Sequence, residues 1–131
     1  MNGLQPGEPV RVAVSDDDPL ALLAIKTMIE NVDSLTFVGG AGGVEEIVSL
    51  TNVTRPHVVV LDWVMPNGGG PEAARRILSD RPGTRIVGLS SSDSPEASLD
   101  MMRAGANGFL LKGGSAEELE ETIRQVVAVW A

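Results

Sequence analysis

Side chains that could carry out chemistry follow four separate apolar runs of the sequence: the pair Asp16-Asp17, then Asp62, Ser90 and Lys112. Carboxylates that lie close together repel one another, which raises their pKa values unless a cation joins them. An oxygen-only set of carboxylates, a backbone carbonyl and water suits Mg²⁺, because that ion keeps much of its hydration and prefers octahedral geometry. These residue types therefore predict a magnesium site, for which Asp16 and Asp17 are the natural acid pair.

The same residues fit phosphoryl transfer. That reaction needs an in-line nucleophile and positive charge on the equatorial oxygens of the phosphoryl group. Asp62 can attack as a carboxylate nucleophile. Lys112 can pair with one phosphoryl oxygen, and Ser90 can donate a hydrogen bond to another. Mg²⁺ would neutralise negative charge on the phosphoryl oxygens.

The elements that position these residues are a parallel sheet and its covering helices. Short apolar runs alternate with longer helical patterns, which is typical of βαβ units. The runs predict five strands, at residues 10–15, 35–39, 58–62, 85–90 and 108–111. Ligands of a doubly wound sheet bind outside the carboxyl ends of its strands. We therefore expect the polar strand ends to converge.

Start signals precede several helical patterns. Pairs that place a capping residue before proline at the first helical position are Asp18-Pro19, Gly70-Pro71 and Ser94-Pro95. The first helix, residues 20–30, is apolar nearly all round, which predicts that it lies deep between its neighbours.

The last helix is predicted from a capping box, in which Ser115 and Glu118 would exchange hydrogen bonds with each other's backbone. An apolar stripe follows the box and should pack on the sheet; its members are Leu119, Ile123, Val126, Val127 and Trp130.

Two segments fall outside the regular pattern. The glycine-rich segment 39–43 is predicted to be a flexible loop between the second strand and the second helix. Residues 1–9 are expected to be a flexible N-terminal extension of a single domain that spans residues 1–131. His57 precedes the third strand, at the end opposite the predicted site, which indicates a structural or exposed role.

Composition narrows the function classes. A chain of 131 residues with 43% hydrophobic and 21% charged residues is typical of one globular domain. The net charge of −8 argues against direct contact with nucleic acid, which needs a basic surface. The absence of cysteine excludes disulfides, thiolate catalysis and cysteine-based zinc sites. No signal peptide or long apolar run is evident, so a cytoplasmic location without membrane contact is expected.

Across almost its whole length the sequence resembles the response-regulator receiver domains of two-component signalling. The matching motifs stand in order: Asp16-Asp17, Asp62-Trp63-Val64-Met65-Pro66 with the glycines after it, Ser90, and residues 104–112, Ala-Gly-Ala-Asn-Gly-Phe-Leu-Leu-Lys. The resemblance implies a flavodoxin-like α/β fold with strand order 2-1-3-4-5 and helices on both faces.

The resemblance also implies residue roles. A histidine kinase or a phosphotransfer protein would phosphorylate Asp62, which would share the metal site with the acid pair and the backbone carbonyl of Val64. Ser90 stands where threonine is commoner and keeps the hydroxyl. Phe109 occupies the aromatic switch position, often tyrosine, and can gate by packing only. Gly113 follows the lysine where many members have a proline in a cis peptide.

A receiver of this kind is a regulatory domain, and the only reactions it catalyses are its own phosphorylation and dephosphorylation. The readout face of the family is the fourth helix, fifth strand and fifth helix, about residues 94–130 here, and dimerisation through this face is a family expectation. Three residues of the fourth helix, Leu99, Met101 and Met102, either belong to such a surface or are scattered apolar side chains. Residues 65–76 and 112–118 most resemble receivers joined to helix-turn-helix DNA-binding domains, which implies a DNA-binding output domain missing from this chain.

Other function classes fit less well. A haloacid-dehalogenase-type phosphohydrolase typically has a second acid two residues after its nucleophile, where this chain has Val64, and a cap domain. A dinucleotide-binding domain would carry Gly-x-Gly-x-x-Gly after the first strand, whereas the glycine cluster follows the second. The remaining alternative is a receiver-like module that binds proteins without phosphate. Retention of the acid pair, Asp62, Ser90 and Lys112 argues against it.

Overall fold

The computed structural model describes residues 4–128 as an alternation of strands and helices. The elements in chain order are β1 (Val10–Ser15), α1 (Pro19–Glu30), β2 (Leu35–Ala41), α2 (Val44–Thr54), β3 (Val58–Asp62), α3 (Gly69–Asp80), β4 (Arg85–Ser90), α4 (Pro95–Arg103), β5 (Gly108–Leu111) and α5 (Ala116–Ala128). All strands except β2 begin and end at the predicted residues. Trp130, predicted to extend the stripe of the last helix, lies outside the described residues.

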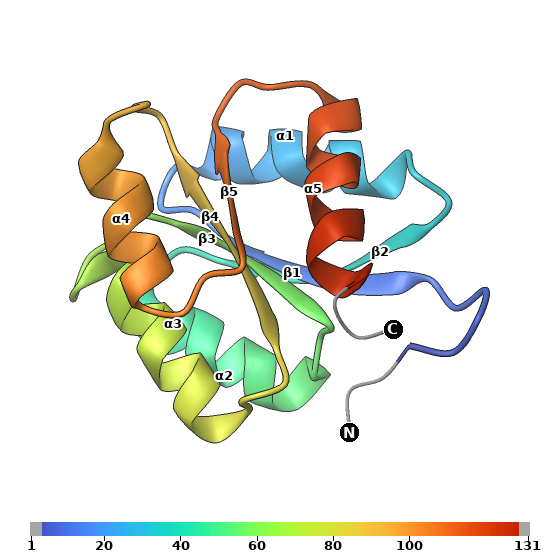
Figure 1. The fold of residues 1–131 in the computed structure, drawn as a ribbon, viewed down its shortest axis with the longest axis horizontal. Coiled ribbons are helices and arrows are strands. Elements are labelled where there is room, and N and C mark those ends of the chain that lie inside the picture. Colours follow the sequence, from blue (N-terminus) through green and yellow to red (C-terminus); the bar gives the residue numbers. More distant parts are fainter. Residues whose placement is uncertain (1–3, 129–131) are drawn as a thin grey trace.

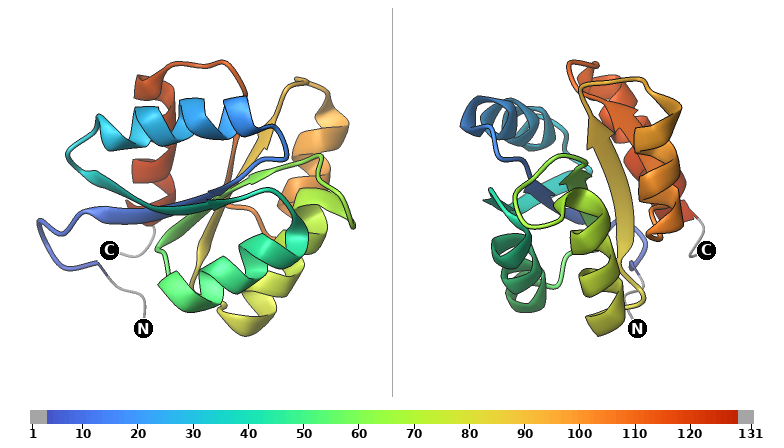
Figure 2. Two further views of the ribbon diagram at one scale, coloured as in Figure 1. Left: turned by 180° about the vertical axis from the view of Figure 1, so that it is seen from behind. Right: turned by 90° about the vertical axis from the view of Figure 1, so that its left-hand side faces the viewer.

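The strands form one parallel sheet in the order β2-β1-β3-β4-β5. Helices α1 and α5 cover one face, and α2, α3 and α4 cover the other (Figures 1 and 2). Each covered face has its own apolar core. The predicted doubly wound, flavodoxin-like fold with helices on both faces is confirmed.

The central strand β3 explains why its sequence is a continuous apolar run. Successive side chains of a strand point to opposite faces, and here both faces are covered. Val58 and Val60 belong to the core under α1 and α5, whereas Val59 and Leu61 belong to the core on the other face. All four are fully buried.

The glycine-rich segment is part of a strand, which corrects the predicted loop. Strand β2 continues through Gly39 and Gly40 to Ala41, so only residues 42 and 43 connect it to α2. A Cβ at Gly39 would lie 2.9 Å from Leu50 Cδ1, and one at Gly40 would lie 3.0 Å from Leu22 Cδ1. These glycines let α2 and α1 pack closely on opposite faces of the edge strand.

Helix starts follow the predicted caps with one exception. Asp18 Oδ1 accepts a hydrogen bond from Leu20 N, and Ser115 and Glu118 form the reciprocal capping box. Helix α3, however, begins at Gly69, earlier than the predicted start at Pro71. No helix among residues 4–128 is long and apolar enough to cross a membrane.

Helix α1 is less buried than its composition predicts. Only Ile29 is buried in it, and Leu20 and Leu23 are 77% and 55% exposed. Among residues 4–128, the layer on this face contains α1 and α5 alone (Figure 1), so side chains of α1 that point away from the sheet and from α5 meet solvent. An apolar sequence pattern cannot bury a helix side that no other element covers.

His57 lies at the opposite end of the sheet from the predicted site, as expected. It is buried, and its Nδ1 accepts a 2.9 Å hydrogen bond from Arg11 N. The backbones of Arg11 and Arg85 bond to that of His57 on either side. These contacts confirm a structural role.

Candidate functional site

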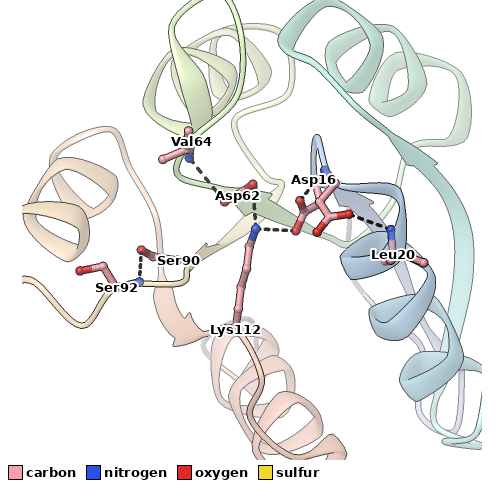
Figure 3. A network of polar contacts seen from close by, with 8 residues as sticks. Asp16, Leu20, Asp62, Val64, Ser90, Ser92 and Lys112 are labelled. Carbon is pink, nitrogen blue, oxygen red and sulfur yellow. Dashed lines mark hydrogen bonds and ion pairs between the residues drawn. The ribbon is translucent and has the colours of Figure 1, made fainter.

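The carboxyl ends of the strands bring the predicted residues to one place (Figure 3). Asp16 follows β1, Asp62 ends β3, and Lys112 follows β5. Backbone hydrogen bonds of 2.7 Å, from Trp63 N to Leu89 O and from Lys112 N to Ser90 O, continue the strand pairing past the strand ends. The sheet therefore holds the first residues of these loops in register.

Three carboxylates gather at this edge. One oxygen each from Asp16, Asp17 and Asp62 lie within 4.8 Å of one another. Asp16 and Asp62 are 1% and 2% exposed, while Asp17 is exposed to solvent. Two of the three acids are therefore buried away from water. An isolated negative charge in such a buried position is costly.

Lys112 supplies the compensating charge. Its Nζ lies 3.0 Å from Asp62 Oδ2 and 2.9 Å from Asp16 Oδ2. Only the contact with Asp62 is aligned as a hydrogen bond, so Asp16 Oδ2 is buried without a hydrogen-bond donor among the described residues. The other oxygen, Asp16 Oδ1, accepts from Asp18 N at 2.9 Å.

Burial raises the pKa of Asp62 to about 6, and the negative charge of Asp16 adds to this effect. Lys112 and the Val64 N–H, which donates to Asp62 Oδ1 at 3.4 Å, act in the opposite direction. Burial alone would lower the pKa of Lys112, but the two carboxylates outweigh it and raise that pKa above its ordinary value. At neutral pH the site holds a charged lysine and a mostly ionised Asp62.

The residues present fit a magnesium ion. Three carboxylates within reach of one cation are acceptors only, and oxygen ligands are those that Mg²⁺ prefers. The buried oxygen Asp16 Oδ2 lacks a hydrogen-bond donor among the described residues, so it could coordinate a metal ion. The structure thus brings together the three carboxylates expected from the sequence.

Ser90 ends β4 beside this cluster and is buried. Its hydroxyl oxygen accepts a 3.0 Å hydrogen bond from Ser92 N. Figure 3 shows the Ser90 hydroxyl beside Ser92 rather than beside Asp62. The hydroxyl is therefore near the carboxylates in the fold but turned towards its own loop.

Comparison with known families agrees with this geometry. The sequence model described as "Response regulator receiver domain" matches residues 12–124, which is most of the chain. The chain belongs to the response regulator receiver family.

Two curated relatives and one solved structure illustrate the similarity. The chain is 39% identical to the uncharacterized transcriptional regulatory protein YxjL of Bacillus subtilis, over 89% of this chain and 54% of that protein. It is 35% identical to the DNA-binding transcriptional activator DevR/DosR of Mycobacterium tuberculosis, over 91% of this chain and 55% of that protein. The signal receiver domain of Mycobacterium tuberculosis NarL superposes with a TM-score of 0.86 at 30% identity, with 92% and 98% of the two chains covered. The chain spans about half the length of the curated relatives it matches.

Within this receiver domain, Phe109 lies inside β5. It pairs with Gly88 across β4 and β5, and its half-buried ring packs on the core under α3 and α4. A Cβ at Gly88 would lie 2.9 Å from both Phe109 Cδ1 and Met101 Cγ. The ring therefore occupies space that the missing side chain of Gly88 leaves free.

The loop after the lysine differs from the family pattern in its backbone. No cis peptide bond occurs among the described residues, and Gly113 has a φ of +82°. Proline cannot adopt that φ. The glycine thus supports a loop conformation other than the one that the proline of many receivers would give.

Two features of the receiver site escape the sequence analysis. A Cβ at Gly69 or Gly70 would lie 2.4 Å from Trp63 O or 2.5 Å from Asp62 O, so both glycines let α3 lie against the acceptor loop. The sequence pattern assigns this glycine run to the helix start and the resemblance includes it in the motif after Asp62, but neither predicts its contact with the acceptor loop. Ser92, which bonds to Ser90, gives no signal because exposed loop serines are common.

Proposed function

We propose that the protein is a phosphorylation-dependent signalling switch whose phosphoacceptor is Asp62. A histidine kinase or a phosphotransfer protein would donate the phosphoryl group. The observation that carries this proposal is the buried Asp62 carboxylate beside Lys112 and Asp16, at the strand ends of a receiver domain. Such a protein would act in the cytoplasm, and residues 1–131 would switch as one domain.

In the proposed step, an oxygen of Asp62 attacks the phosphorus and forms an acyl phosphate. The bond between phosphorus and the donor breaks, and the donor keeps the electron pair and takes up a proton. Lys112 then pairs with a phosphoryl oxygen, and Ser90 donates a hydrogen bond to another. Bound Mg²⁺, held by Asp16, Asp17, Asp62 and the carbonyl of Val64, would supply further positive charge to these oxygens.

The output would be transcriptional. The two curated relatives above are named transcriptional regulators, and this chain matches only about half of each. We propose that the whole protein has a DNA-binding domain outside this chain, because the net charge of −8 disfavours direct DNA contact by the receiver.

The surface that changes would be the α4, β5 and α5 face, through which homodimerisation is also proposed. Leu99, Met102 and Leu111 are exposed on it, which supports a partner surface. Met101 is fully buried and belongs to the core, so it is not part of that surface.

The decisive experiment is the intact mass of the protein after incubation with Mg²⁺ and a small acyl phosphate. The expected result is a gain of one phosphoryl group that disappears in Asp62→Asn and without metal. No adduct in a folded sample that binds Mg²⁺, together with no response to beryllofluoride, would instead support the phosphate-independent interaction module.

A further inference from the structure

A chain of hydrogen bonds connects the end of β4 to the first turn of α4. Ser90 Oγ accepts from Ser92 N at 3.0 Å, and Ser92 Oγ accepts from Ser94 N at 3.2 Å. Ser94 Oγ in turn accepts from Ala97 N at 3.4 Å and caps α4. Each serine hydroxyl thus accepts a hydrogen bond from the backbone N–H of the next residue in the series.

The spacing of the residues makes this chain of bonds. Serine hydroxyls readily accept from backbone N–H groups two or three residues ahead, which stabilises turns and helix starts. Serine stands at positions 90, 92 and 94, and Pro95 then begins α4. Ala97, whose N–H donates the last bond, is fully buried in the first turn of α4. The position of Ser92 therefore affects how α4 begins.

The present position of the Ser90 hydroxyl, rather than the bond it accepts, conflicts with its proposed role, because a hydroxyl can accept and donate at once. The hydroxyl lies beside Ser92 N and not beside Asp62 (Figure 3). To donate to a phosphoryl group on Asp62, the Ser90 side chain must leave its present position for another staggered rotamer, or the loop must move with it. In the first case Ser92 N loses its acceptor, and in the second Ser92 is displaced.

We propose that Ser92 is a positioning residue that transmits the position of the Ser90 hydroxyl to the first turn of α4. This inference rests on the proposed function, because the movement of Ser90 is driven by the phosphoryl group. Ser92 touches neither the reacting atoms nor the carboxylates; it acts through Ser90 on one side and Ser94 on the other.

A first test uses the ¹⁵N-labelled chain without metal or phosphate analogue and follows the amide resonances of Ser94 and Ala97. In Ser92→Ala the Ser94 amide loses its acceptor, so both resonances are expected to shift. Ser92→Thr keeps a hydroxyl and should restore the wild-type positions. Ser91→Ala is the matched control, since Ser91 is an exposed neighbour outside the chain of bonds. An Ala97 resonance that does not move in Ser92→Ala overturns the proposal.

A second test adds Mg²⁺ and beryllofluoride as the phosphoryl analogue. The Trp63 indole resonance reports the site, because Trp63 follows Asp62; Trp130→Phe assigns it, as the sequence has two tryptophans. The wild type, Ser91→Ala and Ser92→Thr should shift at both Trp63 and Ala97. Ser92→Ala should keep the Trp63 shift and lose most of the Ala97 shift.

The outcomes separate the two proposals. A full Ala97 shift in Ser92→Ala would overturn the role of Ser92 and leave the phosphoacceptor site intact. No Trp63 shift in the wild type would overturn the proposed function, and the inference with it.

Discussion

Lys112 and Asp62, which are 50 residues apart in the sequence, meet across the carboxyl end of the sheet in a 3.0 Å hydrogen bond from Nζ to Oδ2. The same ammonium group lies 2.9 Å from Asp16 Oδ2. One cation therefore serves two buried carboxylates in the resting state. A phosphoryl group on Asp62 would compete for that cation, so the residue that stabilises the resting site also takes part in the proposed reaction.

Replacing Lys112 with methionine is expected to destabilise the metal-free protein. Removing one partner of a buried ion pair leaves uncompensated charge, and we expect a loss of roughly 1–3 kcal/mol in the free energy of unfolding because the lysine is partly exposed. Mg²⁺ should restore most of the loss, because the proposed ion would bind the carboxylates of the folded state only. Urea unfolding at pH 7.5 with and without Mg²⁺ measures both effects.

Lys26→Met is the matched control for this prediction. It removes the same charge from α1, where Lys26 lies 5.7 Å from the centre of the Phe37 ring. Its loss should be at most about 1 kcal/mol and insensitive to Mg²⁺. Equal losses in the two variants would mean that Lys112 does not stabilise the carboxylates.

Asp62→Asn should be more stable than the wild type at neutral pH without metal. The pKa of Asp62 is raised by burial to about 6 from an ordinary 3.8, so the folded state holds its proton longer than the unfolded state does. The stability that Asp62 contributes is therefore present at low pH and lost as the pH rises through about 4 to 6. At about 1.4 kcal/mol per pKa unit, the variant should gain roughly 2–3 kcal/mol over the wild type above pH 6.5.

Denaturation of both proteins between pH 4 and pH 8 checks this prediction, because groups common to both cancel in the difference. The difference should be small near pH 4 and reach a plateau above pH 6.5. If the difference in the free energy of unfolding does not change with pH, burial does not raise the pKa of Asp62.

The positions of the strands and of the site residues could be predicted because both depend on local sequence. Apolar runs such as residues 58–62 mark buried strands, and a parallel sheet necessarily gathers the carboxyl ends of its strands at one edge. The convergence of Asp62 and Lys112 follows from that geometry alone and can be predicted without knowing which residues surround each of them.

The errors arise where the outcome depends on residues far away in the sequence. Gly39 and Gly40 are strand residues because Leu50 and Leu22 pack against them, and no local signal separates this from a loop. The exposure of Leu20 arises because none of the described helices lies beyond α1 on that face. The bond from Ser92 to Ser90 depends on the conformation of the loop, which spacing alone does not define.

Gly88→Ala is expected to destabilise the protein by overpacking. The added Cβ would lie 2.9 Å from Met101 Cγ and from Phe109 Cδ1, in a core that has no free space for it. Overpacking of this kind typically costs about 1–3 kcal/mol. The Phe109 ring should also move outward, which its ring-proton resonances would report.

Gly42→Ala is the control for Gly88→Ala, because a Cβ at Gly42 meets only Asp16 O, at 3.8 Å. It should change the free energy of unfolding by less than about 0.5 kcal/mol. If Gly88→Ala is equally well tolerated and the Phe109 ring does not move, then the ring does not depend on the absence of a side chain at Gly88.

His57 should make the protein less stable as the pH falls below 6.5. Burial lowers its pKa, and the positive charge of Arg11 lowers it further, so the unfolded state binds the proton first. The stability that His57 contributes is therefore complete above the ordinary pKa of 6.5 and is lost as the pH falls through the lower folded value. The structural reason is that Nδ1 accepts from Arg11 N, and a protonated Nδ1 would place two N–H donors against each other.

Asp62 has the opposite effect over part of the same pH range, so the His57 prediction is tested in the Asp62→Asn background. His57→Asn keeps an acceptor oxygen for Arg11 N but has no proton to gain, and it should remove the acid-side loss of stability between pH 7 and pH 5. Chemical denaturation at each pH measures the difference. If the double variant loses stability as steeply as its parent with His57 intact, another group titrates there and the hydrogen bond from Arg11 is not the cause.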